Sequence, residues 1–149
     1  VSAQNGDGLD ALLNELTALA VPGPQLFPDD MISDMPEKQI CAELVREAAL
    51  EGVRDELPHS LAVVVEEIVP REGRPDDKPL LDVRVNVFVE RDSQKAIVIG
   101  RGGSRLREVG TNARTGIEAL LGERVHLDLH VKVAKDWQRD PKQLGRLGF

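Results

Sequence analysis

The chain has 149 residues, of which 41% are hydrophobic and 30% charged, a composition that can bury a core and is not that of a disordered tail. No apolar run approaches the roughly 18 residues that a membrane span requires. The single cysteine, Cys41, excludes an intramolecular disulfide framework and a cysteine cluster for zinc. With three phenylalanines, one tryptophan and no tyrosine, the chain is poorly suited to stacking several bases on aromatic platforms.

Charge is distributed unevenly along the chain. The formal net charge is −7, but residues 1–90 hold 7 Lys and Arg against 19 Asp and Glu, whereas residues 91–149 hold 12 against 7. This basic excess in the last third favours a surface that binds a polyanion. The alternative is an ordinary solvated surface of mixed charge.

The first 32 residues predict a short helix and a linker. Leucines repeat at helical spacing over residues 9–20, and Asp7 or Gly8 can cap the start of this helix. Residues 21–32 contain three prolines and a glycine, a composition typical of a linker. Because so short a helix cannot bury its leucines alone, and because the chain does not begin with methionine, we expect residues 1–20 to belong to a further domain of a longer polypeptide.

The next segment predicts one helix and two strands. An apolar face indicates a helix that starts near Ser33 or Asp34, with Pro36 in its first turn and its end near Gly52. Residues 61–69 are β-branched and apolar, and residues 81–90 alternate strictly between valine or leucine and other residues. Both are expected to be strands, joined by the polar loop 71–79.

The last third predicts a helix and a strand around a glycine-rich loop. Residues 93–99 fit either a strand or a buried helix. After the glycines, Ser104 can cap a helix that Gly122 ends. Residues 125–133 alternate like a third strand, and a short tail helix is expected around residues 141–147.

The glycines at 100–103 are the strongest candidate for a ligand-binding loop. The P-loop spacing is absent, and the dinucleotide pattern fails because Arg105 stands where a third glycine is needed. What remains is G-x-x-G, whose glycines admit a close sugar–phosphate chain and whose following helix offers free amides and a positive dipole. With Arg101, Arg105 and Arg107 nearby, we place nucleic-acid binding above a plain flexible turn.

Other clusters predict no catalytic or metal site. His126 and His130 are four apart on a predicted strand, which separates them by roughly 13 Å and prevents chelation of one ion. Acidic doublets such as Glu66-Glu67 are expected to be solvated surface. Cys41, on an apolar helix face, is expected in the core. Trp137 has two interpretations of equal weight, a plug that ties the tail to the domain and a platform for base stacking.

Residues 98–106, Val-Ile-Gly-Arg-Gly-Gly-Ser-Arg-Leu, resemble the signature of a KH domain, in which this loop clamps a single-stranded backbone. The order of elements resembles the type II, prokaryotic, version. More narrowly, residues 89–95, the Lys-Val-Ala-Lys before Trp137, and the terminal Leu-Gly-Phe resemble the C-terminal part of the Era family of bacterial GTPases. Residues 1–8 resemble the fifth guanine-binding motif of such GTPases.

The resemblance covers essentially the whole chain and implies an α+β fold in three parts. Residues 1–20 would be the C-terminal end of a GTPase domain, with its fifth guanine-binding motif and last helix. Residues 21–32 would be a linker. Residues 33–149 would be a type II KH domain of order α-β-β-α-α-β, with a three-stranded sheet and a C-terminal tail.

The resemblance also implies a function. The chain would be the non-enzymatic, RNA-binding part of a GTPase of small ribosomal subunit assembly, binding single-stranded ribosomal RNA near the 3′ end of the small-subunit RNA, and not DNA. GTP and Mg²⁺ are implied for the parent, where Ser2 and Ala3 would contact the guanine, and no cofactor or metal for this chain. The implied location is the cytoplasm, with peripheral association at the inner membrane. The alternatives are the KH module of another RNA-binding protein and a protein-interaction adaptor.

The expected RNA contacts combine backbone clamping by the loop, an apolar groove floor, and cations or rings beside it. The predicted residues are Lys95, Ile97, Val98, Ile99, Gly100, Arg101, Gly102, Gly103, Ser104, Arg105, Leu106, His126, His130, Lys132, Lys135 and Trp137.

Overall fold

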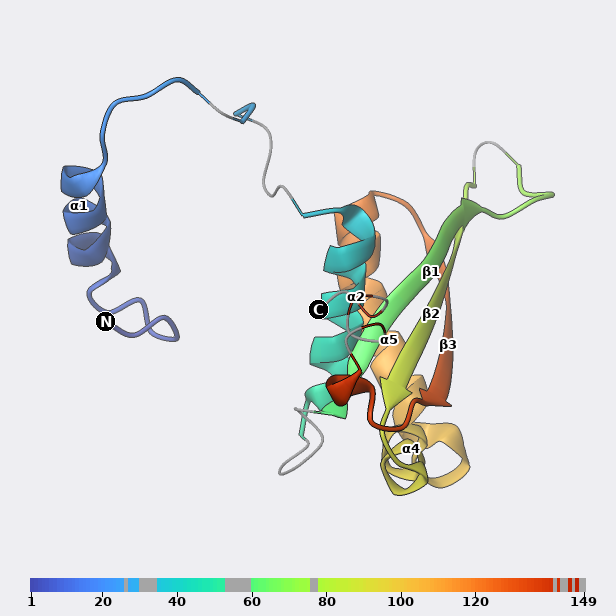
Figure 1. Ribbon diagram of the computed structural model, residues 1–149. Helices are drawn as coiled ribbons and strands as arrows, with labels where there is room; N and C mark the ends of the chain where they lie inside the picture. Colours follow the sequence, from blue (N-terminus) through green and yellow to red (C-terminus); the bar gives the residue numbers. More distant parts are fainter. Residues whose placement is uncertain are drawn as a thin grey trace. The chain divides into compact units, whose positions relative to one another are not determined.

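The computed structural model describes residues 1–25, 27–29, 35–52, 60–75 and 78–140, together with Lys142, Gly145 and Leu147 (Figure 1). The chain divides into two compact units, residues 1–34 and 35–149.

The first unit contains helix α1 (Leu9–Leu19) among its described residues. Gly8 caps this helix in the left-handed conformation. None of the leucines of α1 is buried, so the helix presents an unpartnered apolar stripe within its own unit. The expected helix at residues 9–20 is confirmed to within one residue.

The second unit is built on a three-stranded sheet of order β1-β2-β3. β1 (Ala62–Pro70) runs antiparallel to β2 (Leu81–Val89), and β3 (Val125–Val133) runs parallel to β2. The central Val85 pairs with Val65 on one side and Leu129 on the other. All three predicted strands are present.

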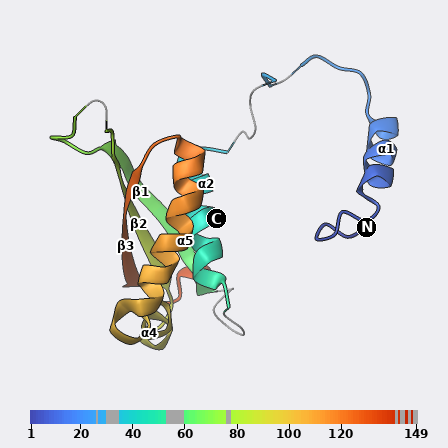
Figure 2. The same cartoon turned by 180° about the vertical axis from the view of Figure 1, so that it is seen from behind.

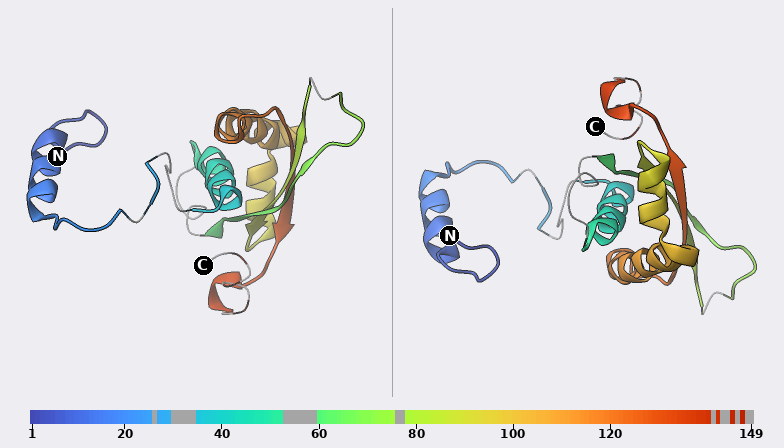
Figure 3. Two further views of the ribbon diagram at one scale, coloured as in Figure 1. Left: turned by 90° about the horizontal axis from the view of Figure 1, so that it is seen from above. Right: turned by 90° about the horizontal axis from the view of Figure 1, so that it is seen from below.

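Three α-helices among the described residues complete the order α-β-β-α-α-β of this unit. They are α2 (Glu37–Leu50), α4 (Asp92–Ile99) and α5 (Ser104–Leu121). Figures 2 and 3 show α2 and α5 side by side on one face of the sheet. The expected α+β fold with this order and a three-stranded sheet is confirmed.

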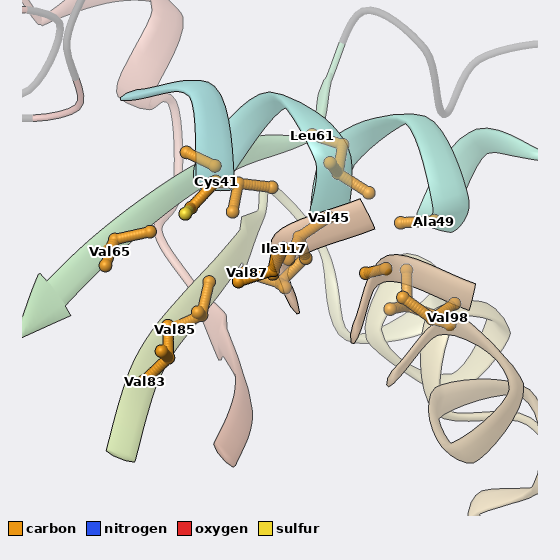
Figure 4. Close-up of a cluster of buried hydrophobic side chains, with 14 of the residues drawn as sticks. Cys41, Val45, Ala49, Leu61, Val65, Val83, Val85, Val87, Val98 and Ile117 are labelled. Atoms are coloured by element: carbon orange, nitrogen blue, oxygen red, sulfur yellow. The ribbon is translucent and has the colours of Figure 1, made fainter. Parts of the chain in front are cut away.

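The core lies between these two helices and the sheet. Alternate valines of β2 point into it from below and the apolar face of α2 from above (Figure 4). Its fully buried members include Cys41, Val45, Ala49, Leu61, Val83, Val85, Val87, Val89 and Ile117. The alternating sequence of β2 therefore predicted its burial correctly, because every second side chain of a strand points to the same face of the sheet, here the face toward the core.

The opposite face of the sheet, here called the outer face, is formed by Asp82, Arg84, Asn86 and Phe88 of β2 and the neighbouring residues of β1 and β3. One end of it is covered by the tail, where Trp137 is 3% exposed and packs with Ala62 and Leu147. Of the two interpretations of Trp137, the structure supports the plug that ties the tail to the domain.

The ambiguous segment 93–99 is helical. The side chain of Gln94 accepts hydrogen bonds from the backbone N–H groups of Glu90 and Arg91, both at 3.0 Å, and donates one of 2.8 Å to the Ser60 hydroxyl. Gly100 then ends α4 with a φ of 72°.

The expected ends of α5 are borne out in part, and the expected tail helix lies mostly beyond the described residues. Ser104 is the first residue of α5 and makes no capping hydrogen bond, because Gly103 occupies the cap position in the left-handed conformation. Gly122 ends α5 as predicted. The tail helix expected around 141–147 falls mostly outside the described residues.

Candidate nucleic-acid interface

The glycine loop, residues 100–103, joins α4 to α5 through a tight turn. Gly100, Gly102 and Gly103 all have positive φ, of 72°, 59° and 76°. The Gly103 N–H closes the turn by donating to the Gly100 carbonyl oxygen at 3.2 Å. Because side-chain-bearing residues rarely adopt such angles, glycine is required for this backbone path.

The glycines of the loop serve two different purposes. A β-carbon on Gly100 would lie 2.7 Å from Cβ of Arg105 and 3.0 Å from its backbone nitrogen, so this glycine permits close packing inside the turn. A β-carbon on Gly102 or Gly103 would meet nothing within 4 Å. These two therefore expose bare backbone at the tip, where another chain can approach closely.

A groove of about 600 Å³ extends from the glycine loop along the space between α5 and the edge strand β3. Its loop end is formed by Gly103 and Leu106, and its floor includes Leu127 and Leu129 of β3. The other lining residues are Arg74, Leu80, Arg107, Gly110, Thr111, Arg114, Glu118, Arg124, Val125 and His126. The groove is thus apolar at its base and polar along its walls.

The groove walls carry an excess of positive charge. Four arginines line it, contributed by the β1–β2 loop, by α5 and by the turn before β3: Arg74, Arg107, Arg114 and Arg124. None of them forms an ion pair with a residue that the structure describes. Glu118 is the one carboxylate among these lining residues, and one of its oxygens accepts the Val125 N–H at 3.0 Å. The electrostatic field in the groove therefore favours an anion.

Charges on the outer face of the sheet are arranged differently. Arg84 lies 2.7 Å from Glu67, and Arg71 lies 3.2 Å from Asp82. The His130 ring nitrogen Nε2 is 2.9 Å from Asp128. The two arginines on this face thus have acidic partners, whereas the four arginines of the groove have none among the described residues. Lys132 is the exposed cation of β3 on the outer face.

Several predicted site residues come together at the groove. Gly100, Arg101, Gly102 and Gly103 form the loop, Arg101 is exposed, and Leu106 lines the groove. His126 lines the edge of the groove, with Nδ1 3.2 Å from the Asp82 carboxylate. Ile97, which is 50% exposed, leaves an apolar side chain on the surface of α4.

Other predicted contacts lie elsewhere. Val98 is 1% exposed and belongs to the core, so it is not part of a groove floor. Nη2 of Arg105 donates to the backbone carbonyls of Ala49 and Glu51 at the end of α2, so this nitrogen is directed into the protein and not toward the groove. Buried Trp137 offers no face on which a base can stack. These three assignments are corrected because spacing along a helix or tail does not reveal which neighbour a side chain meets.

The remaining predicted residues do not line the groove. Lys132 and His130 belong to alternate positions of β3 that face the outer side of the sheet. Lys135 lines a separate polar hollow of about 360 Å³ next to the β2–α4 turn. Lys95, Ile99 and Ser104 flank the loop without lining the groove.

Sequence reasoning missed much of the far end of the groove. Arg74, Arg114 and Arg124 were not selected, although positions 107, 111, 114 and 118 share one face of a helix at a spacing of three and four residues. That periodicity could have identified the face of α5 that lines the groove. The contribution of Arg74 could not have been found, because it depends on where the β1–β2 loop reaches.

Ser2 and Ala3 lie in the first unit. Ser2 forms a tight turn, in which its N–H donates to the Asp7 carbonyl at 2.9 Å and its hydroxyl accepts the Asn5 N–H at 3.3 Å. Within the described part of the chain, no three His, Cys, Asp or Glu side chains are grouped to hold a metal ion. The described helices also include none that is long and apolar enough to cross a membrane.

Comparison with curated proteins finds relatives along the whole chain. Proteins named GTPase Era are 66% identical over all 149 residues in a Nocardioides species, and 64% identical in Mycobacterium tuberculosis and in Streptomyces coelicolor. The match covers 48%, 49% and 47% of those proteins. The chain therefore spans about half the length of the relatives it matches.

Solved structures show the same similarity. A crystal structure of Era in complex with MgGDPNP and nucleotides 1506–1542 of 16S ribosomal RNA superposes with a TM-score of 0.92 at 40% identity, covering 99% of this chain and 48% of that one. A variant of Aquifex aeolicus Era bound to GDP and AlF₄⁻ gives a TM-score of 0.91, also at 40% identity and the same coverage. The family model of the KH domain matches residues 56–138, more than half of the chain and including the glycine loop, α5 and β3. The chain belongs to the KH-domain family.

Proposed function

We propose that this chain is the RNA-binding KH module of an Era-like GTPase and binds single-stranded ribosomal RNA along the groove between α5 and β3. The observation that carries the proposal is the exposed glycine backbone of Gly102 and Gly103 at one end of a groove walled by arginines without acidic partners among the described residues. The complex of a 40% identical Era with 16S ribosomal RNA supports this class of ligand.

The sugar–phosphate chain would be held at the loop and along the walls. Exposed backbone at Gly102 and Gly103 lets a phosphate approach, and Arg101 adds charge at the same tip. The Ser104 N–H donates to the Arg101 carbonyl, and the next amides of the first turn of α5 have no acceptor within the helix, so they can meet a phosphate. Arg107 and Arg114 then continue the positive wall along the groove. Such contacts set affinity and register but do not read sequence.

The bases would face the floor of the groove. Leu106, Leu127 and Leu129 offer an apolar surface that suits unstacked bases, and polar groups such as Thr111 can meet base edges. This mode needs no aromatic platform, in agreement with a chain that has four aromatic residues, of which Trp137 is buried. Preference for RNA over DNA would come from the 2′-hydroxyl groups.

The wider role belongs to the parent protein. We propose that GTP and Mg²⁺ bind there, that Ser2 and Ala3 contribute to its guanine site, and that residues 1–20, 21–32 and 33–149 are respectively the end of the GTPase domain, a linker and the KH domain. We further propose that the parent protein acts in small ribosomal subunit assembly in the cytoplasm and binds near the 3′ end of the small-subunit RNA. It would also associate peripherally with the inner membrane.

The test replaces Arg101 and Gly102 together by aspartate. Two carboxylates then face the phosphate path and one cation is lost, so we expect affinity for a single-stranded RNA of the 16S 3′ sequence to fall more than tenfold, about 1.4 kcal/mol. The loop tip is exposed, so the free energy of unfolding should change by little beyond the backbone strain of about 1–2 kcal/mol at Gly102. RNA titration and thermal unfolding on the same samples measure both.

A matched control combines G6D with R139D. It makes the same change of charge and places aspartate on another glycine of positive φ with open space around it, while neither position lines the groove. The control should bind RNA within threefold of the unmodified chain. If R101D/G102D remains folded and binds RNA as well as the control does, the proposed clamp at the glycine loop is wrong. If the unmodified chain does not bind this RNA, a protein-interaction adaptor becomes the better interpretation.

A further inference from the structure

The guanidinium of Arg105 is used inside the protein, although the residue follows the glycine loop by only two positions. Its Nη2 donates to the backbone carbonyl of Ala49 at 3.1 Å and to that of Glu51 at 2.8 Å. These carbonyls lie at the C-terminal end of α2, where a helix runs out of its own N–H donors and where positive charge is favoured. Arg105 therefore ties the first turn of α5 to the last turn of α2.

The same junction has a second bond further along α5. The Asn112 side-chain nitrogen Nδ2 donates to the Glu51 carboxylate at 3.1 Å. At the other end of the hairpin formed by α4, the loop and α5, the buried Gln94 binds Ser60, just before β1. Both helices of the hairpin are thus attached by side chains to the end of α2 or to the residue before β1.

Contact between Arg105 and the loop transmits this attachment to the glycines. The 2.7 Å separation found for a β-carbon on Gly100 means that the backbone of Gly100 rests directly against Arg105. A displacement of the first turn of α5 must therefore displace the loop, whose tip is otherwise free of neighbours.

We propose that Arg105 is a positioning residue, which fixes the first turn of α5 on the end of α2 so that the glycine loop meets RNA in one orientation, without itself contacting RNA. The RNA side of this inference rests on the proposed function. The other part of the inference, that Arg105 holds the loop in one conformation in the free protein, does not depend on RNA binding.

The test compares R105M with R107M. Each removes one positive charge from the first turn of α5, but Arg107 lines the groove and has no ion pair with a described residue. For R105M we expect affinity for single-stranded RNA to fall about tenfold with an unchanged slope of log K against log salt. For R107M the slope should become shallower by about 0.7, the value of one phosphate contact. A slope change in R105M equal to that in R107M, or unchanged affinity, would overturn the proposal.

A second measurement uses the protein without RNA. Amide hydrogen exchange at Gly103 and through Glu108 should be at least tenfold faster in R105M than in the unmodified chain, whereas exchange at Val85 and Val87 of β2 should stay within threefold. R107M should leave all these rates unchanged. Equal acceleration in β2 would mean general destabilisation and would reject a specific positioning role.

If R105M does not fold, R105K serves in its place. Lysine keeps the charge but lacks the planar fork and reach of arginine. We expect exchange at Gly103 to be at least threefold faster in R105K, and a rate equal to that of the unmodified chain would overturn the proposal. Loss of RNA binding in R101D/G102D but not in R105M would reject this inference alone, whereas full RNA binding by R101D/G102D would reject the glycine loop as the RNA site.

Discussion

The side-chain nitrogen of Gln94 donates a 2.8 Å hydrogen bond to the hydroxyl of Ser60, and both residues are buried, 7% and 5% exposed. The same amide accepts the backbone N–H groups of Glu90 and Arg91 through its oxygen. One glutamine side chain therefore accepts hydrogen bonds from the backbone N–H groups just before α4 and also joins this helix to the residue that precedes β1.

Replacing Gln94 by alanine should lower the free energy of unfolding by about 2–4 kcal/mol. The substitution leaves two backbone N–H groups without an acceptor, and an unsatisfied buried polar group costs about 1–3 kcal/mol. The neighbouring exposed Ser93, changed to alanine, should shift stability by no more than about 0.5 kcal/mol. Urea denaturation measures both, and equal stabilities of the two variants would show that the Gln94 network does not support the turn.

Alanine at Gly100 and at Gly103 should have unequal effects. Both glycines have positive φ, which costs about 1–2 kcal/mol for a side-chain-bearing residue. At Gly103 the new methyl group would stand in open space, so G103A should cost little more than that. At Gly100 the methyl group would collide with Arg105, so G100A should cost at least about 3 kcal/mol. Thermal unfolding that gives the two variants the same stability would contradict the packing inside the turn.

RNA binding should depend steeply on salt. With about three or four phosphates neutralised, log K for single-stranded RNA should fall against log salt with a slope near −2 to −3. R114Q should make that slope shallower by about 0.7, because Arg114 lines the groove without an acidic partner among the described residues. R84Q is the control, since Arg84 lies on the outer face beside Glu67. A flat salt dependence would rule out phosphate contacts as the source of affinity.

Cys41 should be an unreactive thiol in the folded chain. Burial raises the pKa of the Cys41 thiol, and the negative charge of Glu37 raises it further. Modification by a thiol reagent at pH 8 should therefore be slow in the native chain and fast after denaturation. Equal rates in the two states would show that the thiol is not buried.

The same pKa shift fixes the sign of a stability change. Above about pH 9, the usual pKa of the thiol, the unfolded chain loses the proton before the folded chain does. The free energy of unfolding of the unmodified chain should therefore decline with rising pH relative to that of C41A. Parallel pH profiles of the two proteins would contradict this linkage.

The fold was largely predictable because its strands and helices carry regular apolar periods. The alternation of β2 and β3 and the apolar stripe of α5 each reflect one buried face, so period and burial agree. Residues 93–99 could not be assigned in this way. Their helix depends on Gln94, whose partner Ser60 is 34 positions away.

The site was predictable at the loop and less so along the groove. The glycines predict the backbone conformation of the loop directly, because glycine readily adopts the positive φ angles found there. The destination of a long side chain is set by tertiary contacts instead. Arg105 lies next to the loop in sequence yet binds α2, whereas Arg74 lies far from the loop in sequence yet lines the groove.

The most direct test of the groove as the RNA site is an NMR titration of the ¹⁵N-labelled chain with a single-stranded RNA of the 16S 3′ sequence. The account predicts that amide shifts concentrate at residues 100–107, on the groove side of α5 through Glu118, and at residues 125–129 of β3. Amides of β1, which lies on the far side of β2 from the groove strand, should stay in place. Shifts confined to β1 and the tail, with the glycine loop unaffected, would contradict the account.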